Sequence, residues 1–114
     1  SGPLLITYFH PECDHCRYEI ASIFRSDLLD SDVKIILVSH ADLSQIKLFM
    51  EQFDMRDYPC VYVLHDPDLA FGEIFGTEII PSNFIYNKDL QLIKALRGET
   101  TTETIIKYLH SSDK

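Results

Sequence analysis

The sequence predicts an α/β sandwich whose central sheet is mostly parallel and has one antiparallel edge. Three observations lead to this prediction: strand-like and helix-like segments alternate along the chain, the early strands are continuous apolar runs typical of strands buried on both faces, and two strands joined by a tight turn follow later. A chain of 114 residues has the length of one domain. Its 46% apolar and 25% charged residues are ordinary for a folded protein. We therefore predict a single domain over residues 1–114.

The first half of the chain is expected to form strand, helix, strand, helix. Residues 4–9, LLITYF, are an apolar run rich in β-formers. After Cys13, apolar or small side chains recur at helical spacing as far as Leu28, which predicts an amphipathic helix. Residues 32–39 form a second buried strand, and Asp42 is a candidate N-cap for a second helix.

The second half is expected to add a third strand, a short helix, a hairpin and a last helix. Residues 60–66 resemble a strand that Asp-Pro closes, and residues 68–76 a short helix that a glycine ends. Residues 83–86 and 90–96 are strand-like and flank the turn residues Asn-Lys-Asp. Threonine caps and one apolar side predict a helix over residues 100–110.

Charge and hydropathy exclude some function classes. Eighteen acidic against ten basic side chains give a net charge of −8, which repels nucleic-acid phosphates, so we expect no nucleic-acid partner. No stretch approaches the roughly 20 apolar residues that span a bilayer, so we expect no membrane insertion of this segment. The dipeptide Ser1-Gly2 replaces an initiating Met and is interpreted as a cloning remnant, which would hide any upstream signal or anchor.

Two of the three cysteines, Cys13 and Cys16, stand at the predicted strand-to-helix junction in the sequence CDHC. Residues three apart share a helix face, so the pair can close a small disulfide ring. The positive end of the helix dipole favours the thiolate of Cys13, which is nearer the N-terminus. We therefore expect Cys13 to attack and Cys16, on the apolar side of the helix, to resolve the mixed disulfide.

These residues resemble the thioredoxin-fold thiol-disulfide oxidoreductases, especially the TlpA/ResA-like branch. The likeness covers nearly the whole chain and rests on CDHC after the first strand, on IIPSNFIY at residues 79–86, and on Gly98 after the last strand. It implies a three-layer α/β/α sandwich with an antiparallel C-terminal hairpin. It also implies that Pro81 is a cis-proline beside the cysteine pair and that the backbone of Ile80 binds the substrate.

The resemblance further implies an enzyme that exchanges a redox-active disulfide with protein substrates and needs no other cofactor. A thiol-based electron donor or acceptor would be its second partner. Location in a bacterial periplasm or cell envelope is implied as well, with a possible membrane anchor upstream of this segment. We expect a monomer.

Glu19 and the residues between the cysteines are candidates for moving or tuning protons. Glu19 lies one helical turn after Cys16, where a carboxylate could exchange a proton with the pair, and it matches a glutamate of ResA-like proteins; the alternative is a glutamate on the surface. A protonated His15 would stabilise a thiolate, whereas Asp14 would oppose it. Thr7 stands where classical thioredoxins have a buried aspartate, so general thioredoxin activity is in question.

Other uses of the cysteines fit the sequence less well. A c-type haem site needs histidine directly after Cys16, where the chain has Arg17. A peroxiredoxin-like peroxidase needs Thr or Ser three before its cysteine and proline four earlier; relative to Cys16 these positions hold Cys13 and Phe9. A structural zinc site lacks its second cysteine pair, because Cys60 stands alone and is expected to pack in the core.

Two alternatives stay open. Cys13 and Cys16 with His10 or His15 could hold Cu(I), as in a thioredoxin-fold copper chaperone. The fold could also serve as an interaction module with an inert disulfide. The favoured prediction remains a thiol-disulfide oxidoreductase, with no metal bound.

Overall fold

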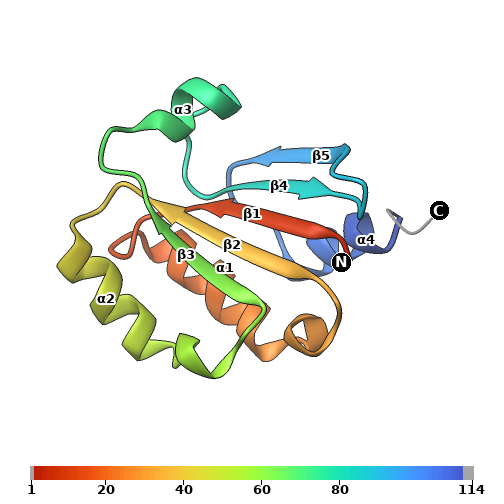
Figure 1. Ribbon diagram of the computed structural model, residues 1–114, viewed down its shortest axis with the longest axis horizontal. Coiled ribbons are helices and arrows are strands. Elements are labelled where there is room, and N and C mark those ends of the chain that lie inside the picture. Colours follow the sequence, from red (N-terminus) through yellow and green to blue (C-terminus); the bar gives the residue numbers. More distant parts are fainter. Residues whose placement is uncertain (1, 112–114) are drawn as a thin grey trace.

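The computed structural model describes residues 2–111, in which five strands form one mixed sheet of order β3-β2-β1-β4-β5 (Figure 1). Strands β1, β2 and β3 run parallel, and β4 runs antiparallel to both β1 and β5. This confirms the mostly parallel sheet with its C-terminal hairpin. The cloning interpretation of Ser1-Gly2 involves Ser1, which lies outside the described residues. The strands are β1 Leu4–Tyr8, β2 Lys34–Ser39, β3 Val61–His65, β4 Ser82–Tyr86 and β5 Leu92–Arg97.

The helices lie on the two faces of this sheet in unequal numbers. Buried side chains of α1, α2 and α4 join one cluster against the first face, whereas α3 packs on the second face. Figure 1 shows α3 set apart from the other three helices. The predicted three layers are therefore present, and the third layer is a single short helix. The bounds are α1 Asp14–Arg25, α2 Leu43–Gln52, α3 Ala70–Phe75 and α4 Thr102–Ser111, with 3-10 turns at Asp27–Asp30 and Met55–Asp57.

The main core follows from the alternation of side chains along the strands. Leu5, Leu37 and Ile85 point to the face that α1, α2 and α4 cover, and all are buried. Helix α1 contributes Ile20 and Ile23, which are three residues apart and share one helix face. Burying these apolar groups holds α1 rigidly against β1, which fixes the direction in which the helix begins.

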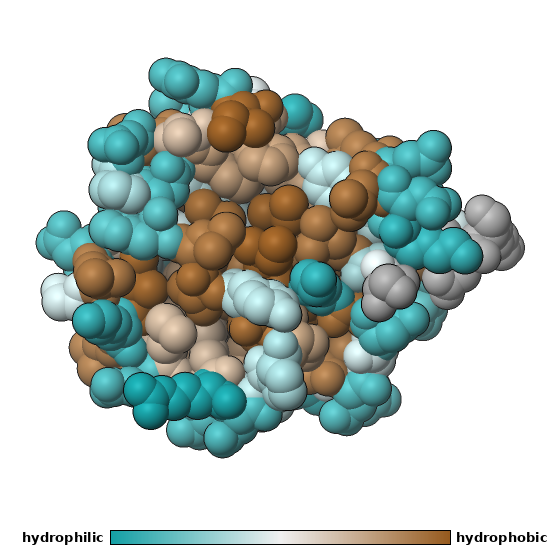
Figure 2. Space-filling model, viewed as in Figure 1, coloured by the Kyte–Doolittle hydropathy of each residue, from teal (hydrophilic) through white to brown (hydrophobic). Residues whose placement is uncertain are grey.

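The second face has a smaller cluster centred on aromatic rings. Phe71 of α3 stacks on Tyr8 of β1 with ring centroids 4.2 Å apart, and it stacks on Phe75 at the same spacing. Tyr62 and Leu64 of β3 remain 47% and 51% exposed. Figure 2 shows apolar side chains gathered across the middle of the molecule in this view. Helix α3 therefore covers only part of the second face.

Candidate active site

The cysteine pair lies where β1 passes into α1. Residues Phe9 to Cys13 connect the two elements, and the Cys13 N–H donates to the His10 carbonyl oxygen at 3.0 Å. Cys13 is the N-cap of α1, and its Sγ accepts a hydrogen bond from the Cys16 N–H at 3.2 Å. The unpaired N–H groups of the first turn and the helix dipole both favour negative charge on this sulfur.

The two thiols have different surroundings. Cys13 is half-buried, whereas Cys16 is 0% exposed and belongs to the main core. Burial is the main reason that the pKa of the Cys16 thiol is raised, and the hydrogen bond with Cys13 raises that pKa further. An accessible sulfur at the helix N-terminus thus stands beside a buried, protonated thiol.

The segment before β4 reaches the same edge of the sheet. Because β4 is antiparallel to β1, its first residue, Ser82, pairs with Tyr8 at the end of β1. The Ile80–Pro81 peptide bond directly before it is cis. The Gly98 N–H donates to the Pro81 carbonyl oxygen at 2.9 Å, so the segments after β5 and before β4 are joined. Pro81, Gly98 and the start of the cysteine loop therefore share one end of the sheet.

Glu19 is buried within this end of the molecule and is 1% exposed. Its Oε1 accepts hydrogen bonds from Asn83 Nδ2 at 3.1 Å and from the Thr100 N–H at 3.3 Å. The hydroxyl of Thr7 in turn donates to Asn83 Oδ1 at 2.7 Å. Burial raises the pKa of Glu19 to about 7, although both hydrogen bonds act to lower that pKa. The inward position expected for Glu19 is correct, and the surface alternative is wrong.

Sequence reasoning missed the partners of Glu19. In the sequence, Asn83 belongs to a predicted strand and Thr100 to a predicted helix start. Both are distant from Glu19 in sequence, so no local spacing connects them to it. The signal that could have found Asn83 is its place as a polar residue in an otherwise buried strand, since a buried amide needs a partner.

The residues between the cysteines are exposed. His15 Nδ1 lies 2.7 Å from Glu99 Oε2, and this exposed pair brings Glu99, which the sequence analysis did not consider, to the rim of the site. Asp14 is in the first turn of α1, where a negative charge suits the helix dipole. The His10 ring is turned toward its own loop, because its Nδ1 accepts from the Glu12 N–H at 3.1 Å.

Among residues 2–111, no group of three or more His, Cys, Asp and Glu side chains is placed to hold a metal ion. Cys60 precedes β3 rather than lying inside it, is half-buried, and points its thiol at the Leu29 carbonyl oxygen at 3.7 Å. The expected core position of Cys60 is therefore wrong, because the strand begins one residue later, after a turn.

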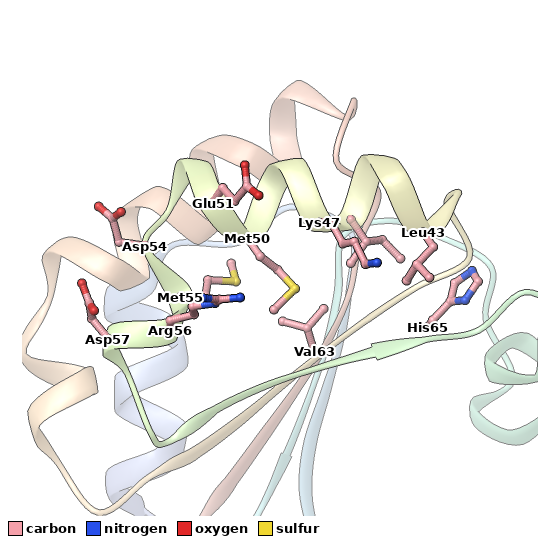
Figure 3. A pocket seen from close by; sticks show the side chains of 11 residues that line it. Leu43, Lys47, Met50, Glu51, Asp54, Met55, Arg56, Asp57, Val63 and His65 are labelled. Carbon is pink, nitrogen blue, oxygen red and sulfur yellow. The ribbon is translucent and has the colours of Figure 1, made fainter.

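A cavity of about 690 Å³ lies away from the cysteines, between α2 and β3 (Figure 3). Met50 of α2 and Val63 of β3 face one another across it, and charged side chains such as Glu51 and Arg56 surround them. No cysteine lines this cavity. The candidate active site is instead the end of the sheet that carries Cys13 and Pro81.

Comparisons with known proteins identify the fold. No family model matches the chain, and no curated protein matches it. The chain is similar to the solution structure of a protein described as a thioredoxin from Neisseria meningitidis, with a TM-score of 0.81, 19% identity, and coverage of 96% of this chain and 73% of that one.

Two further similar structures come from Mycobacterium tuberculosis. One is DsbF, captured in mixed oxidised and reduced forms, with a TM-score of 0.81, 15% identity, and coverage of 96% of this chain and 80% of that one. The other is a secreted disulfide oxidoreductase, with a TM-score of 0.77, 13% identity, and coverage of 96% of this chain and 81% of that one. The protein therefore has a thioredoxin fold, as the sequence analysis predicted.

Proposed function

We propose that this protein is a thiol-disulfide oxidoreductase that exchanges a Cys13–Cys16 disulfide with protein substrates. The observation that carries the proposal is the difference between the two sulfurs: Cys13 Sγ caps α1 and is accessible, whereas Cys16 is fully buried. The similar thioredoxin-fold structures described as disulfide oxidoreductases support the same reaction class.

In the reducing direction, the thiolate of Cys13 attacks one sulfur of a substrate disulfide. A mixed disulfide forms, and the first substrate sulfur leaves as a thiolate. Cys16 then loses its proton and attacks Cys13 Sγ, so that the second substrate sulfur leaves and the Cys13–Cys16 disulfide forms. Two electrons pass to the substrate, and the same steps in reverse oxidise a substrate dithiol.

Cys16 needs a proton acceptor because burial keeps it in the thiol form. Glu19 is the candidate, since it is buried one helical turn away and its pKa of about 7 suits proton transfer near neutral pH. The exposed His15 and Asp14 would adjust the charge near Cys13. The backbone of Ile80, next to Pro81, would bind an extended substrate peptide.

We place this activity in the bacterial cell envelope, in keeping with the similar structure described as secreted. A thiol-based donor or acceptor of electrons would regenerate the cysteine pair. No helix within the described part of the chain is long and apolar enough to cross a membrane.

The test is a redox titration of the purified protein in thiol-disulfide buffers, with each cysteine followed by alkylation and peptide mass. Cys13 and Cys16 should titrate as one two-electron couple while Cys60 stays free. A potential near about −270 mV would indicate a reductant, and one near about −120 mV an oxidant. A pair that does not exchange, or that low concentrations of Cu(I) protect from alkylation, would contradict the proposal.

Matched single variants test the roles of the two sulfurs. Cys13→Ser should abolish exchange, whereas Cys16→Ser should accumulate a mixed disulfide on Cys13 that gel shift and mass spectrometry detect. Cys60→Ser is the control and should exchange at the wild-type rate. Full turnover by Cys16→Ser would show that the assignment of roles is wrong.

A further inference from the structure

The two carboxyl oxygens of Glu19 have different environments. Oε1 accepts two N–H hydrogen bonds, from Asn83 and from Thr100. Oε2 is buried and has no hydrogen-bond partner among the described residues. A buried polar atom without a partner is uncommon and points to a ligand, water or proton at that position.

Glu19 also lines a cavity of about 340 Å³ between α1 and the start of α4. Ser22 of α1 and Thr102 of α4 are hydrogen-bonded to each other at 2.6 Å in its wall. The cavity is large enough for several water molecules, since each occupies about 30 Å³ in the liquid. Its lining includes neither the cysteines nor Pro81, so a substrate bound at those residues would leave it open.

The hydrogen bonds determine which oxygen carries the proton when Glu19 is neutral. Oε1 already accepts from two N–H donors, so the proton belongs on Oε2. The amide of Asn83 keeps its Nδ2 toward Glu19 because Thr7 donates its hydroxyl hydrogen to Asn83 Oδ1. The orientation of the carboxyl group therefore depends on a residue in β1 and another in β4.

We propose that Thr7 and Asn83 are positioning residues that make Oε2 the proton-carrying oxygen of Glu19, and that this proton exchanges with solvent through the cavity between α1 and α4. The inference rests on the proposed function. When the Cys16 sulfur attacks Cys13 Sγ, its proton passes to Oε2, and Glu19 later releases that proton to water in the cavity. In the reverse reaction the same oxygen returns the proton to Cys16.

The charges around the cavity suit this route. Glu99 lies before α4, Glu103 lies in the first turn of α4, and both line the cavity. Tyr18 of α1 is the other titratable residue, besides Glu19, in the lining. Burial is the main cause of the raised pKa of Glu19, and the negative charge of Glu99 raises it further. Cys16 is the titratable group one turn before Glu19 on α1. The acidic groups at the rim of the cavity attract the proton that Glu19 releases.

The first test measures the titration of the Glu19 side chain by carboxyl ¹³C NMR in the reduced protein, without substrate. Thr7→Val keeps the shape of the side chain but removes the hydroxyl. The Asn83 amide is then no longer held toward Glu19, so the midpoint of the Glu19 titration should move to higher pH. Thr7→Ser keeps the hydroxyl and should titrate like the wild type. An unchanged midpoint in Thr7→Val, or an equal shift in Thr7→Ser, would overturn the role of Thr7 and Asn83.

The second test concerns the cavity. Ser22→Leu fills it, whereas Ser22→Ala removes the same hydroxyl without filling it. We expect the resolution of a preformed mixed disulfide to be several-fold slower in Ser22→Leu than in Ser22→Ala. The pH profile of that rate should also be displaced to higher pH in Ser22→Leu. Equal rates and profiles in the two variants would overturn the cavity route.

The two readouts separate this inference from the proposed function. Failure of the wild-type cysteine pair to exchange would refute the proposed function and, with it, the transfer of a proton from Cys16. The NMR titration needs no exchange, so it would still decide whether Thr7 and Asn83 position the Glu19 carboxyl group.

Discussion

Burial has the same effect on Cys16 and Glu19: it disfavours the charged form and raises the pKa of each. The consequences differ because the ordinary pKa of a thiol is higher than that of a carboxyl group. The Cys16 thiol stays protonated throughout the physiological range, whereas Glu19, with a pKa of about 7, changes charge within it. Glu19 is therefore the buried group whose charge responds to pH near neutrality.

This titration should also appear in the stability of the protein. A carboxyl group whose pKa is raised by folding binds its proton more tightly in the folded state, so stability is complete below the unfolded value of 4.5 and falls as pH rises to about 7. The shift corresponds to about 3 kcal/mol of unfolding free energy. We expect Glu19→Gln to lack this loss, because it keeps the shape and Oε1 of the side chain.

The measurement is urea denaturation of reduced wild-type and Glu19→Gln protein at pH 5 and pH 8. Other groups titrate in both proteins, so the difference between the two isolates Glu19. Glu19→Gln should gain stability relative to the wild type on going from pH 5 to pH 8. A constant difference between the two pH values would mean that Glu19 titrates as an ordinary surface carboxylate.

Local spacing places Cys16 one turn after Cys13 and Glu19 one turn after Cys16, and it left both a buried and a surface position open for Glu19. It could not predict Asn83 or Thr100, which reach Glu19 across 64 and 81 residues of sequence. Such contacts exist only once β4 and the start of α4 are packed beside α1.

At the scale of elements, apolar runs and helical periodicity located each strand and helix to within a few residues. The two 3-10 turns were not predicted, because hydrophobic periodicity does not mark such short turns, and side-chain hydrogen bonds begin the first of them. Ser26 shows this: its hydroxyl donates to the Ile23 carbonyl oxygen at 2.6 Å and accepts from the Leu28 N–H at 3.2 Å, which ends α1 and starts the turn.

Helix α3 depends on a side chain that precedes it. Asp66 accepts hydrogen bonds from the Ala70 and Phe71 N–H groups, both at 2.9 Å, so both carboxylate oxygens satisfy free donors of the first turn. Loss of such capping costs about 1–2 kcal/mol. We expect Asp66→Ala to lower the unfolding free energy by this amount in urea denaturation.

The control for this variant is Asp68→Ala, since Asp68 is exposed in the same loop and carries the same charge. It should leave the unfolding free energy within about 0.5 kcal/mol of the wild type. Equal effects of the two substitutions would show that charge, and not capping, stabilises α3.

At the scale of the whole molecule, the two faces of the sheet are unequally supported. The first face packs against three helices and includes residues from β1, β2 and β4. The second is covered only in part, by α3, whose contact with the sheet centres on Phe71 and Phe75. Strand β1 lies between β2 and β4 at the centre of the sheet, so its amides should open only when the whole domain unfolds.

Helix α3 should open without the rest of the fold, because six residues and two anchoring rings bury little surface compared with the main core. In native-state hydrogen exchange, its amides should exchange orders of magnitude faster than those of β1, at rates that small additions of urea barely change. The β1 amides should instead accelerate with urea as global unfolding does. Equal protection and equal urea dependence in α3 and β1 would mean that α3 belongs to the same cooperative unit as the main core, and that both faces fold together.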